Sequence, residues 1–182
     1  MNISNYYWYF KSALTPKFCD DVIAYANSQK EVIAKTGGYD KKKLSSDILK
    51  SELTNSKFLF SRNWDMLNTY IRDHVNVEQH INLINKQTWG NSYKPNQTTI
   101  PLLNIEPIDL KNSPDYTCLY GVKVDKCMVR IHYEDNRRKG RSWDIELTNN
   151  KFIIFPSTCM YYLNNNQKDS LNFVQTITYE YI

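Results

Sequence analysis

Few side chains in this sequence are of the types that most often bind metals or act as general bases. The 182 residues include three histidines, His74, His80 and His132, and the last 50 residues contain none. The motif His132-Tyr-Glu134 has the spacing of a chelating pair, because alternate residues of a strand point to the same face. No later histidine can complete a metal site. We therefore interpret His132 as a structural residue and retain a metal site at this motif as the alternative.

The sequence lacks the other common catalytic motifs. It has no glycine-rich phosphate loop, no nucleophile elbow and no helix with paired histidines. Its four cysteines, Cys19, Cys118, Cys127 and Cys159, show no CxxC spacing, which argues against a structural zinc site. We expect all four to be buried free thiols in a reducing compartment, and we expect neither a metal nor a cofactor.

The most concentrated charge of the chain is a basic turn. It comprises Arg137, Arg138, Lys139 and Arg141, and it falls where the tip of a hairpin is expected. The net charge of the chain is only +4, and acidic residues precede the turn directly. The sequence leaves two interpretations open: a solvated loop, or a contact for an acidic partner or for phosphates.

Length and composition favour a single domain of residues 1–182. A chain of this size with 41% apolar residues can bury one core, and its 14 tyrosines favour half-buried strands. Residues 1–80 are expected to carry two amphipathic helices, one from Thr15 to Gly37 and one over 63–78 with Asn63 as its cap. The second helix has an apolar stripe of Trp64, Leu67, Ile71 and Val75. We expect short strands at 6–10 and 58–60, and a loop over 39–56 with a helical turn near Ile48.

From residue 81 the pattern changes to short strands between turn residues. The expected strands are 82–89, 99–105, 116–124, 126–134, 142–147, 151–155, 159–163 and 170–181, with turns that include 164–166. In the last strand apolar and polar residues alternate, so one face is expected to meet the core. Eight short strands at this spacing predict a jelly roll of two facing sheets over residues 81–182. The expected fold class is α+β, with the two N-terminal helices packed against this barrel.

Three segments near the C-terminus follow one another in a characteristic order. They are Lys151–Ser157, which ends in Phe-Pro-Ser, then Met160–Leu163, and then Ser170–Val174. In this order they resemble the end of the barrel of the iron- and 2-oxoglutarate-dependent oxygenases, in their phage-associated, prolyl-hydroxylase-like branch. The opening residues Tyr6–Pro16 also look like the start of those phage proteins. The resemblance implies a double-stranded β-helix, which is the jelly roll expected from the strand pattern.

The resemblance also implies an iron site whose ligands this chain does not supply. That family binds iron through His-x-Asp on an early strand and a distal histidine on a later one. When Tyr93–Gln97 is matched to the family's Tyr-Lys-x-Gly-Gln, the His-x-Asp positions fall on Leu102 and Asn104, and the distal position falls on Tyr161. Residues 142–182 contain no arginine to pair with the co-substrate carboxylate. We expect Leu102 and Tyr161 to contact one another inside the barrel, where they close the degenerate metal site.

Together these observations predict a non-enzymatic protein of oxygenase fold. We expect a structural or protein-interaction module, a pseudoenzyme, that contacts other proteins of a phage assembly or a second copy of itself. The expected location is the virion or the host cytoplasm, because the sequence shows neither a signal peptide nor a membrane-length apolar segment. Two alternatives remain: a hydroxylase with unusual iron ligands, and a jelly roll that binds sugar or nucleic acid.

Overall fold

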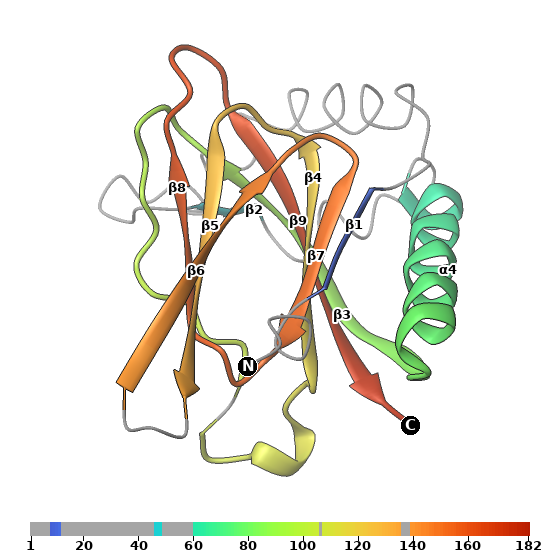
Figure 1. Ribbon diagram of the computed structural model, residues 1–182. Coiled ribbons are helices and arrows are strands. Elements are labelled where there is room, and N and C mark those ends of the chain that lie inside the picture. The colour runs from blue at the N-terminus through green and yellow to red at the C-terminus, as the bar shows by residue number, and fades with distance from the viewer. Residues whose placement is uncertain (1–7, 12–45, 49–59, 106, 136–138) are drawn as a thin grey trace.

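The computed structural model describes residues 8–11, 46–48, 60–105, 107–135 and 139–182. This part of the chain forms two antiparallel β-sheets that face one another, with one long helix beside the larger sheet (Figure 1). The helix expected between Thr15 and Gly37 lies outside the described residues, as does Cys19. The expected jelly-roll arrangement of two sheets is therefore observed, with one described helix in place of the expected two.

The larger sheet has six strands in the order β1-β7-β4-β9-β3-β2, and each neighbouring pair is antiparallel. Their bounds are β1 Trp8–Lys11, β7 Lys151–Pro156, β4 Tyr116–Lys123, β9 Asn172–Tyr181, β3 Leu83–Tyr93 and β2 Ser46–Ile48. The central strands β4 and β9 come from distant parts of the sequence, so the sheet forms only when the C-terminal strand inserts between β4 and β3.

The smaller sheet has the order β6-β5-β8, with bounds β6 Lys139–Leu147, β5 Cys127–Asp135 and β8 Tyr161–Asn165. The chain at residues 98–102 runs along β8 and contacts it through two isolated bridges, Thr98 to Asn164 and Leu102 to Tyr161. The strand expected at 99–105 is thus reduced to these two bridges. A short 3-10 helix, η2 (Leu110–Asn112), follows in the connection to β4.

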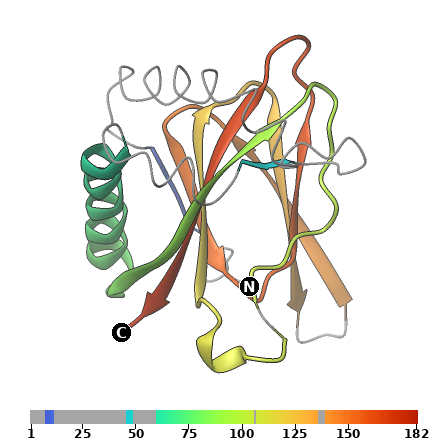
Figure 2. The ribbon, with the colours of Figure 1, turned by 180° about the vertical axis from the view of Figure 1, so that it is seen from behind.

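Helix α4 (Phe60–Gln79) packs against the outer face of the larger sheet, and both views show it apart from the smaller sheet (Figure 1 and Figure 2). Leu67, Ile71 and Val75 follow one another every four residues, and all three are fully buried. They pack with Phe152 of β7 and Ile177 of β9. The apolar stripe predicted from the sequence is confirmed at these three positions.

A second core fills the space between the two sheets. Its buried residues include Leu119 of β4, Ile131 of β5, Leu163 of β8 and Val174 of β9. Strand β9 contributes to both cores, because Val174 belongs to this one and Ile177 belongs to the helix-facing one. Eight consecutive residues of β9 are buried. The expectation that only one face of this strand meets the core is therefore wrong: a central strand between a helix and a second sheet has no solvent face.

An amide cluster closes one end of the barrel. Asn172 Nδ2 donates to Asn165 Oδ1 at 2.8 Å and to Gln167 Oε1 at 3.1 Å, and the three residues are buried. The backbone N of Asp125 donates to Asn172 Oδ1 at 2.8 Å. The buried side chains satisfy one another and the adjoining turn, so this end of the barrel needs no solvent to satisfy them.

Four local expectations are wrong because tertiary pairing or the length of helix α4 determined the structure instead. Helix α4 begins at Phe60, so Asn63 lies inside the helix instead of capping it, and Phe60 does not belong to a strand. Ile48 pairs with Gly90 as part of β2 and forms no helical turn. Asn165 pairs with Cys127 at the end of β8, so the turn expected at 164–166 begins later.

We predict that Ile71→Ala lowers the free energy of unfolding by about 2–5 kcal/mol, because the fully buried side chain leaves a cavity between α4 and the sheet. Val77→Ala on the same helix is the matched control: Val77 is 69% exposed, so its truncation is expected to change stability by less than about 0.5 kcal/mol. Urea unfolding measures both values. Equal costs for the two variants would contradict the observed packing of α4.

Candidate functional site

The candidate site begins with the pairing of Leu102 and Tyr161. The backbone N of Leu102 donates to the Tyr161 carbonyl at 2.7 Å, and the backbone N of Tyr161 donates to the Leu102 carbonyl at 3.0 Å. Tyr161 is buried at the start of β8, and Leu102 is half-buried against the core between the sheets. These two residues, which come from distant segments, therefore contact one another as expected.

Asn104 joins this pair through its side chain. Its Nδ2 donates to the Tyr161 hydroxyl at 3.0 Å and to Thr117 Oγ1 at 3.2 Å. Thr117 in turn shares a hydrogen bond of 2.9 Å with Ser157 Oγ, and both residues are buried. We call these four side chains, Asn104, Thr117, Ser157 and Tyr161, the Tyr161 network.

Sequence reasoning did not identify Thr117 and Ser157 as site residues. A signal was present for each: Thr117 occupies an inward position two residues before Leu119 of the barrel core, and Ser157 ends the Phe-Pro-Ser run. Phe155, from the same run, contacts the Tyr161 ring edge to face, with ring centroids 5.1 Å apart. The network thus lies against an apolar wall, where satisfied hydrogen bonds are strong and unsatisfied polar groups are costly.

The donor set of this site does not fit iron(II). The iron of the oxygenases that the sequence resembles needs imidazole and carboxylate ligands, whereas the side chain of Leu102 has no donor atom, that of Asn104 is an amide and that of Tyr161 is a phenol. The Asn104 amide already donates to both neighbouring hydroxyl oxygens. Among the described residues, no group of three or more histidine, cysteine, aspartate or glutamate side chains could hold a metal ion.

The inward positions of β9, the strand on which the resemblance implies a co-substrate arginine, are uncharged. They are Asn172, Val174, Thr176 and Thr178, which alternate with the helix-facing residues of the strand. Thr176 Oγ1 accepts a hydrogen bond of 2.9 Å from Asn91 Nδ2. Lys151 at the start of β7 donates its Nζ to the Glu146 carbonyl at 2.6 Å. The lining of this part of the barrel is therefore polar but neutral.

His132 lies on the other face of the smaller sheet from Tyr161. Its neighbour Ile131 is buried in the core between the sheets, while His132 is exposed and its ring lies 5.6 Å from that of Tyr162. The side chain of Glu134 lies outside the described residues. The exposed position of His132 on the outer face of the smaller sheet favours the structural interpretation of this residue.

The outer face of the smaller sheet carries an ion pair. Arg130 donates through Nη2 to Asp144 Oδ2 at 2.6 Å and through Nη1 to the Tyr162 hydroxyl at 2.9 Å. The hydrogen bond from Arg130 lowers the pKa of Asp144, and the two side chains are about 42% and 43% exposed. A pair this exposed contributes little to stability, so it orders the surface more than it holds the fold together.

The basic turn joins β5 to β6 as a hairpin, in which Asp135 pairs with Lys139. Arg137 and Arg138 lie outside the described residues, and of Lys139 only the backbone is described. Arg141 is exposed on β6. The expected hairpin is thus confirmed, while the contacts of its basic tip stay a prediction.

Comparison with known proteins identifies the fold. No protein family and no curated protein matches the sequence. Among solved structures, a Pseudomonas putida prolyl-4-hydroxylase is similar with a TM-score of 0.63 at 12% identity, over 98% of this chain and 94% of that one. The viral collagen prolyl hydroxylase of Paramecium bursaria Chlorella virus-1 gives 0.61 at 13% identity, over 98% of both chains. An α-ketoglutarate-dependent carbocyclase of nogalamycin biosynthesis gives 0.63 at 11% identity, over 95% of this chain and 78% of that one.

These likenesses establish that the chain has the fold of prolyl hydroxylases and related oxygenases. At such low identities they establish nothing about activity. No helix in the described part of the chain is long and apolar enough to cross a membrane.

Cys118, Cys127 and Cys159 are buried free thiols, as expected for them. Burial raises the pKa of the Cys127 thiol to about 12 and that of Cys159 to about 11. Burial also raises the pKa of Cys118. Thiols in this state are poor nucleophiles near neutral pH, so they act as packing residues.

We predict that Cys127 makes the fold sensitive to alkaline pH. The thiol ionises near its ordinary value of 9.0 in the unfolded chain but only near 12 in the folded one, so its contribution is fully present below pH 9.0 and is lost as pH rises toward 12. The stability difference between wild type and Cys127→Ala should therefore shrink by about 1.4 kcal/mol per pH unit in this window. Denaturant unfolding from pH 7 to 11 measures the difference; a constant difference would contradict the burial of the thiol.

Proposed function

We propose that this protein is a non-catalytic member of the oxygenase fold that acts through contacts with other proteins. The observation that carries the proposal is the Tyr161 network together with the Leu102–Tyr161 pairing. At the three positions where the resemblance puts iron ligands, the chain has an apolar side chain, an amide and a phenol that contact one another.

The physical argument is that these residues satisfy one another without a metal. In an oxygenase, the ligand side chains point at an ion and leave positions open for co-substrate and oxygen. Here Asn104 Nδ2 donates to Tyr161 and Thr117, and Thr117 bonds Ser157, so the polar atoms are paired within the protein. The Leu102 side chain has no polar atom, so it can neither bind a metal nor need a hydrogen-bond partner. This arrangement supports a role in which the barrel is a scaffold.

The assignment to a phage assembly rests on the sequence resemblance, and the partner class rests on the exposed Tyr181 and on the basic turn. Tyrosine and arginine are the side chains that most often dominate protein interfaces. A hydroxylase with unusual ligands is the alternative, because the solved structures of this fold named above include hydroxylases. Binding of sugar or nucleic acid is the third possibility.

We predict that the wild-type protein binds no stoichiometric iron(II) and releases no succinate from 2-oxoglutarate. The variant Leu102→His/Asn104→Asp/Tyr161→His restores the ligand types of the facial triad, and we expect it to bind one equivalent of manganese(II) under anaerobic titration. The matched control Leu103→His/Ile105→Asp/Met160→His introduces the same three side chains one residue away, where Leu103 and Met160 are exposed to solvent, and should bind none.

Two results would count against the proposal. Micromolar iron binding by the wild-type protein that depends on 2-oxoglutarate would revive the hydroxylase alternative. Equal metal binding by the triple variant and its control would contradict the assignment of Leu102, Asn104 and Tyr161 to the metal positions, whatever the wild-type protein does.

We further predict that the basic turn contributes to association. Replacing Arg137, Arg138, Lys139 and Arg141 by glutamine should weaken self-association or retention of a native partner, and should reduce the salt dependence of that association, because fewer charge pairs form. Replacing four exposed lysines elsewhere, Lys111, Lys123, Lys126 and Lys168, is the charge-matched control. Sedimentation velocity at two salt concentrations measures the effect. A monomer with no retained partner would contradict the prediction, and salt-sensitive binding of single-stranded DNA would favour the third possibility.

A further inference from the structure

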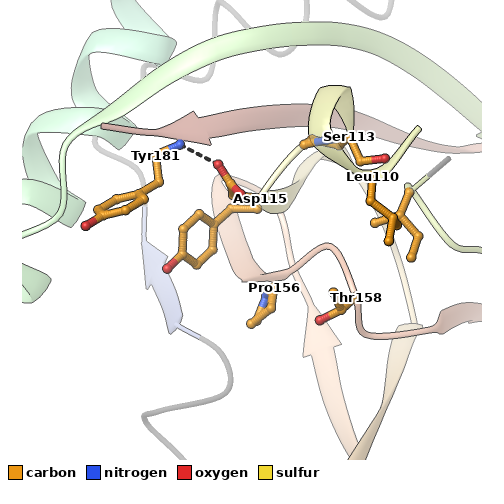
Figure 3. A pocket seen from close by; sticks show the side chains of 9 residues that line it. Leu110, Ser113, Asp115, Pro156, Thr158 and Tyr181 are labelled. Carbon is orange, nitrogen blue, oxygen red and sulfur yellow. Dashed lines mark hydrogen bonds between the residues drawn. The ribbon is translucent and has the colours of Figure 1, made fainter. Parts of the chain in front are cut away.

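A pocket of about 390 Å³ opens at the ends of three neighbouring strands of the larger sheet, at the start of β4 and the ends of β7 and β9. Figure 3 shows side chains from three parts of the chain around it: the connection that contains η2, the turn after β7, and the end of β9. Tyr116 lines the pocket and packs with the helix-facing core, whereas its neighbour Thr117 belongs to the network inside the barrel. The pocket is therefore a second site, on the outside of the fold.

Most of the pocket lining is apolar or aromatic, and Asp115 is its one carboxylate. The other lining residues are Ile105, Leu110, Ser113, Pro114, Tyr116, Pro156, Thr158 and Tyr181. Leu110 is 65% exposed and Tyr181 is 60% exposed, so the rim presents large apolar surfaces to solvent. Exposed apolar groups around a polar centre are typical of a binding site.

Hydrogen bonds from both neighbouring strands hold Asp115 in place. Its Oδ2 accepts from the backbone N of Tyr181 at 2.8 Å (Figure 3). Its own backbone N donates to the Tyr179 carbonyl at 2.9 Å, and its carbonyl accepts from the backbone N of Ser157 at 2.8 Å. The carboxylate is thus preorganised, so little ordering is needed when a ligand binds.

The charge of Asp115 is not balanced within the described residues. The ion pairs found there are Lys86 with Glu180 and Arg130 with Asp144, and Asp115 belongs to neither. The pKa of the adjacent Tyr116 is raised, mainly by burial and then by the negative charge of Asp115. A cation is the complementary ligand.

We propose that this pocket binds an arginine side chain presented by a partner protein. The guanidinium would pair with the Asp115 carboxylate and lie against the rings of Tyr116 and Tyr181, while its aliphatic stem packs on Leu110 and Pro156. Arginine fits better than lysine, because its planar group both pairs with carboxylates and stacks on aromatic faces. The inference deepens the proposed function, since it gives one site and one partner chemistry for protein contact.

The test is an NMR titration of the ¹⁵N-labelled full chain with the blocked tripeptide acetyl-Gly-Arg-Gly-amide. We expect chemical-shift changes confined to the amides of Asp115, Tyr116, Thr158 and Tyr181. The citrulline and norleucine versions of the peptide, which lack the charge, should bind at least about tenfold more weakly, because a charge-assisted hydrogen bond is lost. The lysine peptide should bind more weakly than the arginine peptide and more tightly than the two uncharged peptides.

Asp115→Asn removes the charge but keeps an oxygen that can accept from Tyr181 N, and it should weaken arginine binding by a similar factor. Asp125→Asn at the opposite end of the barrel is the matched control and should leave binding unchanged. If Asp115→Asn does not fold, Thr158→Lys on the exposed rim supplies an internal cation that should compete with the peptide.

Equal binding of the norleucine peptide would overturn the inference in favour of an apolar ligand, and shifts that avoid Asp115 and Tyr181 would overturn it outright. The titration involves neither iron nor assembly. A failure here removes the arginine site alone, whereas 2-oxoglutarate-dependent turnover by the wild-type chain would remove the proposed function and leave the peptide result standing.

Discussion

The burial of β9 on both faces is the constraint on which the rest of the structure depends. This strand is the last of the chain, yet it lies between β4 and β3, with the helix on one side and the smaller sheet on the other. Its inward and outward residues must both find partners away from water. The helix side is filled mainly by apolar groups such as Phe173 and Ile177. The inward side mixes Val174 with Thr176 and Thr178, whose hydroxyls hydrogen-bond to the neighbouring strand β3.

This constraint explains why the interior of the barrel holds a paired polar network and not isolated polar groups. A buried hydroxyl or amide without a partner is costly, so the polar side chains at these positions must pair with one another. Asn104, Thr117, Ser157 and Tyr161 do so with hydrogen bonds of 2.9 to 3.2 Å across three separate parts of the chain. The Leu102 side chain has no polar atom, so it leaves no buried polar group unpaired. These five residues thus contribute to packing, in agreement with the scaffold role that we propose for this part of the fold.

The sequence predicted those features that a local period determines. The helix stripe at Leu67, Ile71 and Val75, the hairpin between β5 and β6, and the two-sheet arrangement follow from spacing alone. The second buried face of β9 does not, because polar threonines on a central strand look like solvent-facing residues until a second sheet covers them. The pocket around Asp115 was equally inaccessible to sequence reasoning, since Asp115 and Tyr181 lie 66 positions apart and come together only when β9 inserts beside β4.

The carboxylates of Asp144 and Asp115 differ in whether their charge is neutralised within the protein or is available to a partner. Asp144 lies across from Arg130 on neighbouring strands, and the short hydrogen bonds between them neutralise it within the protein. A ligand cation would have to displace Arg130 to reach Asp144, so little binding energy is available there. Asp115 is held by backbone N–H groups, which fix its position without cancelling its charge. Its charge, among aromatic and proline side chains, remains available to a partner. This difference makes the pocket at the end of β9 a better candidate for protein contact than the outer face of the smaller sheet.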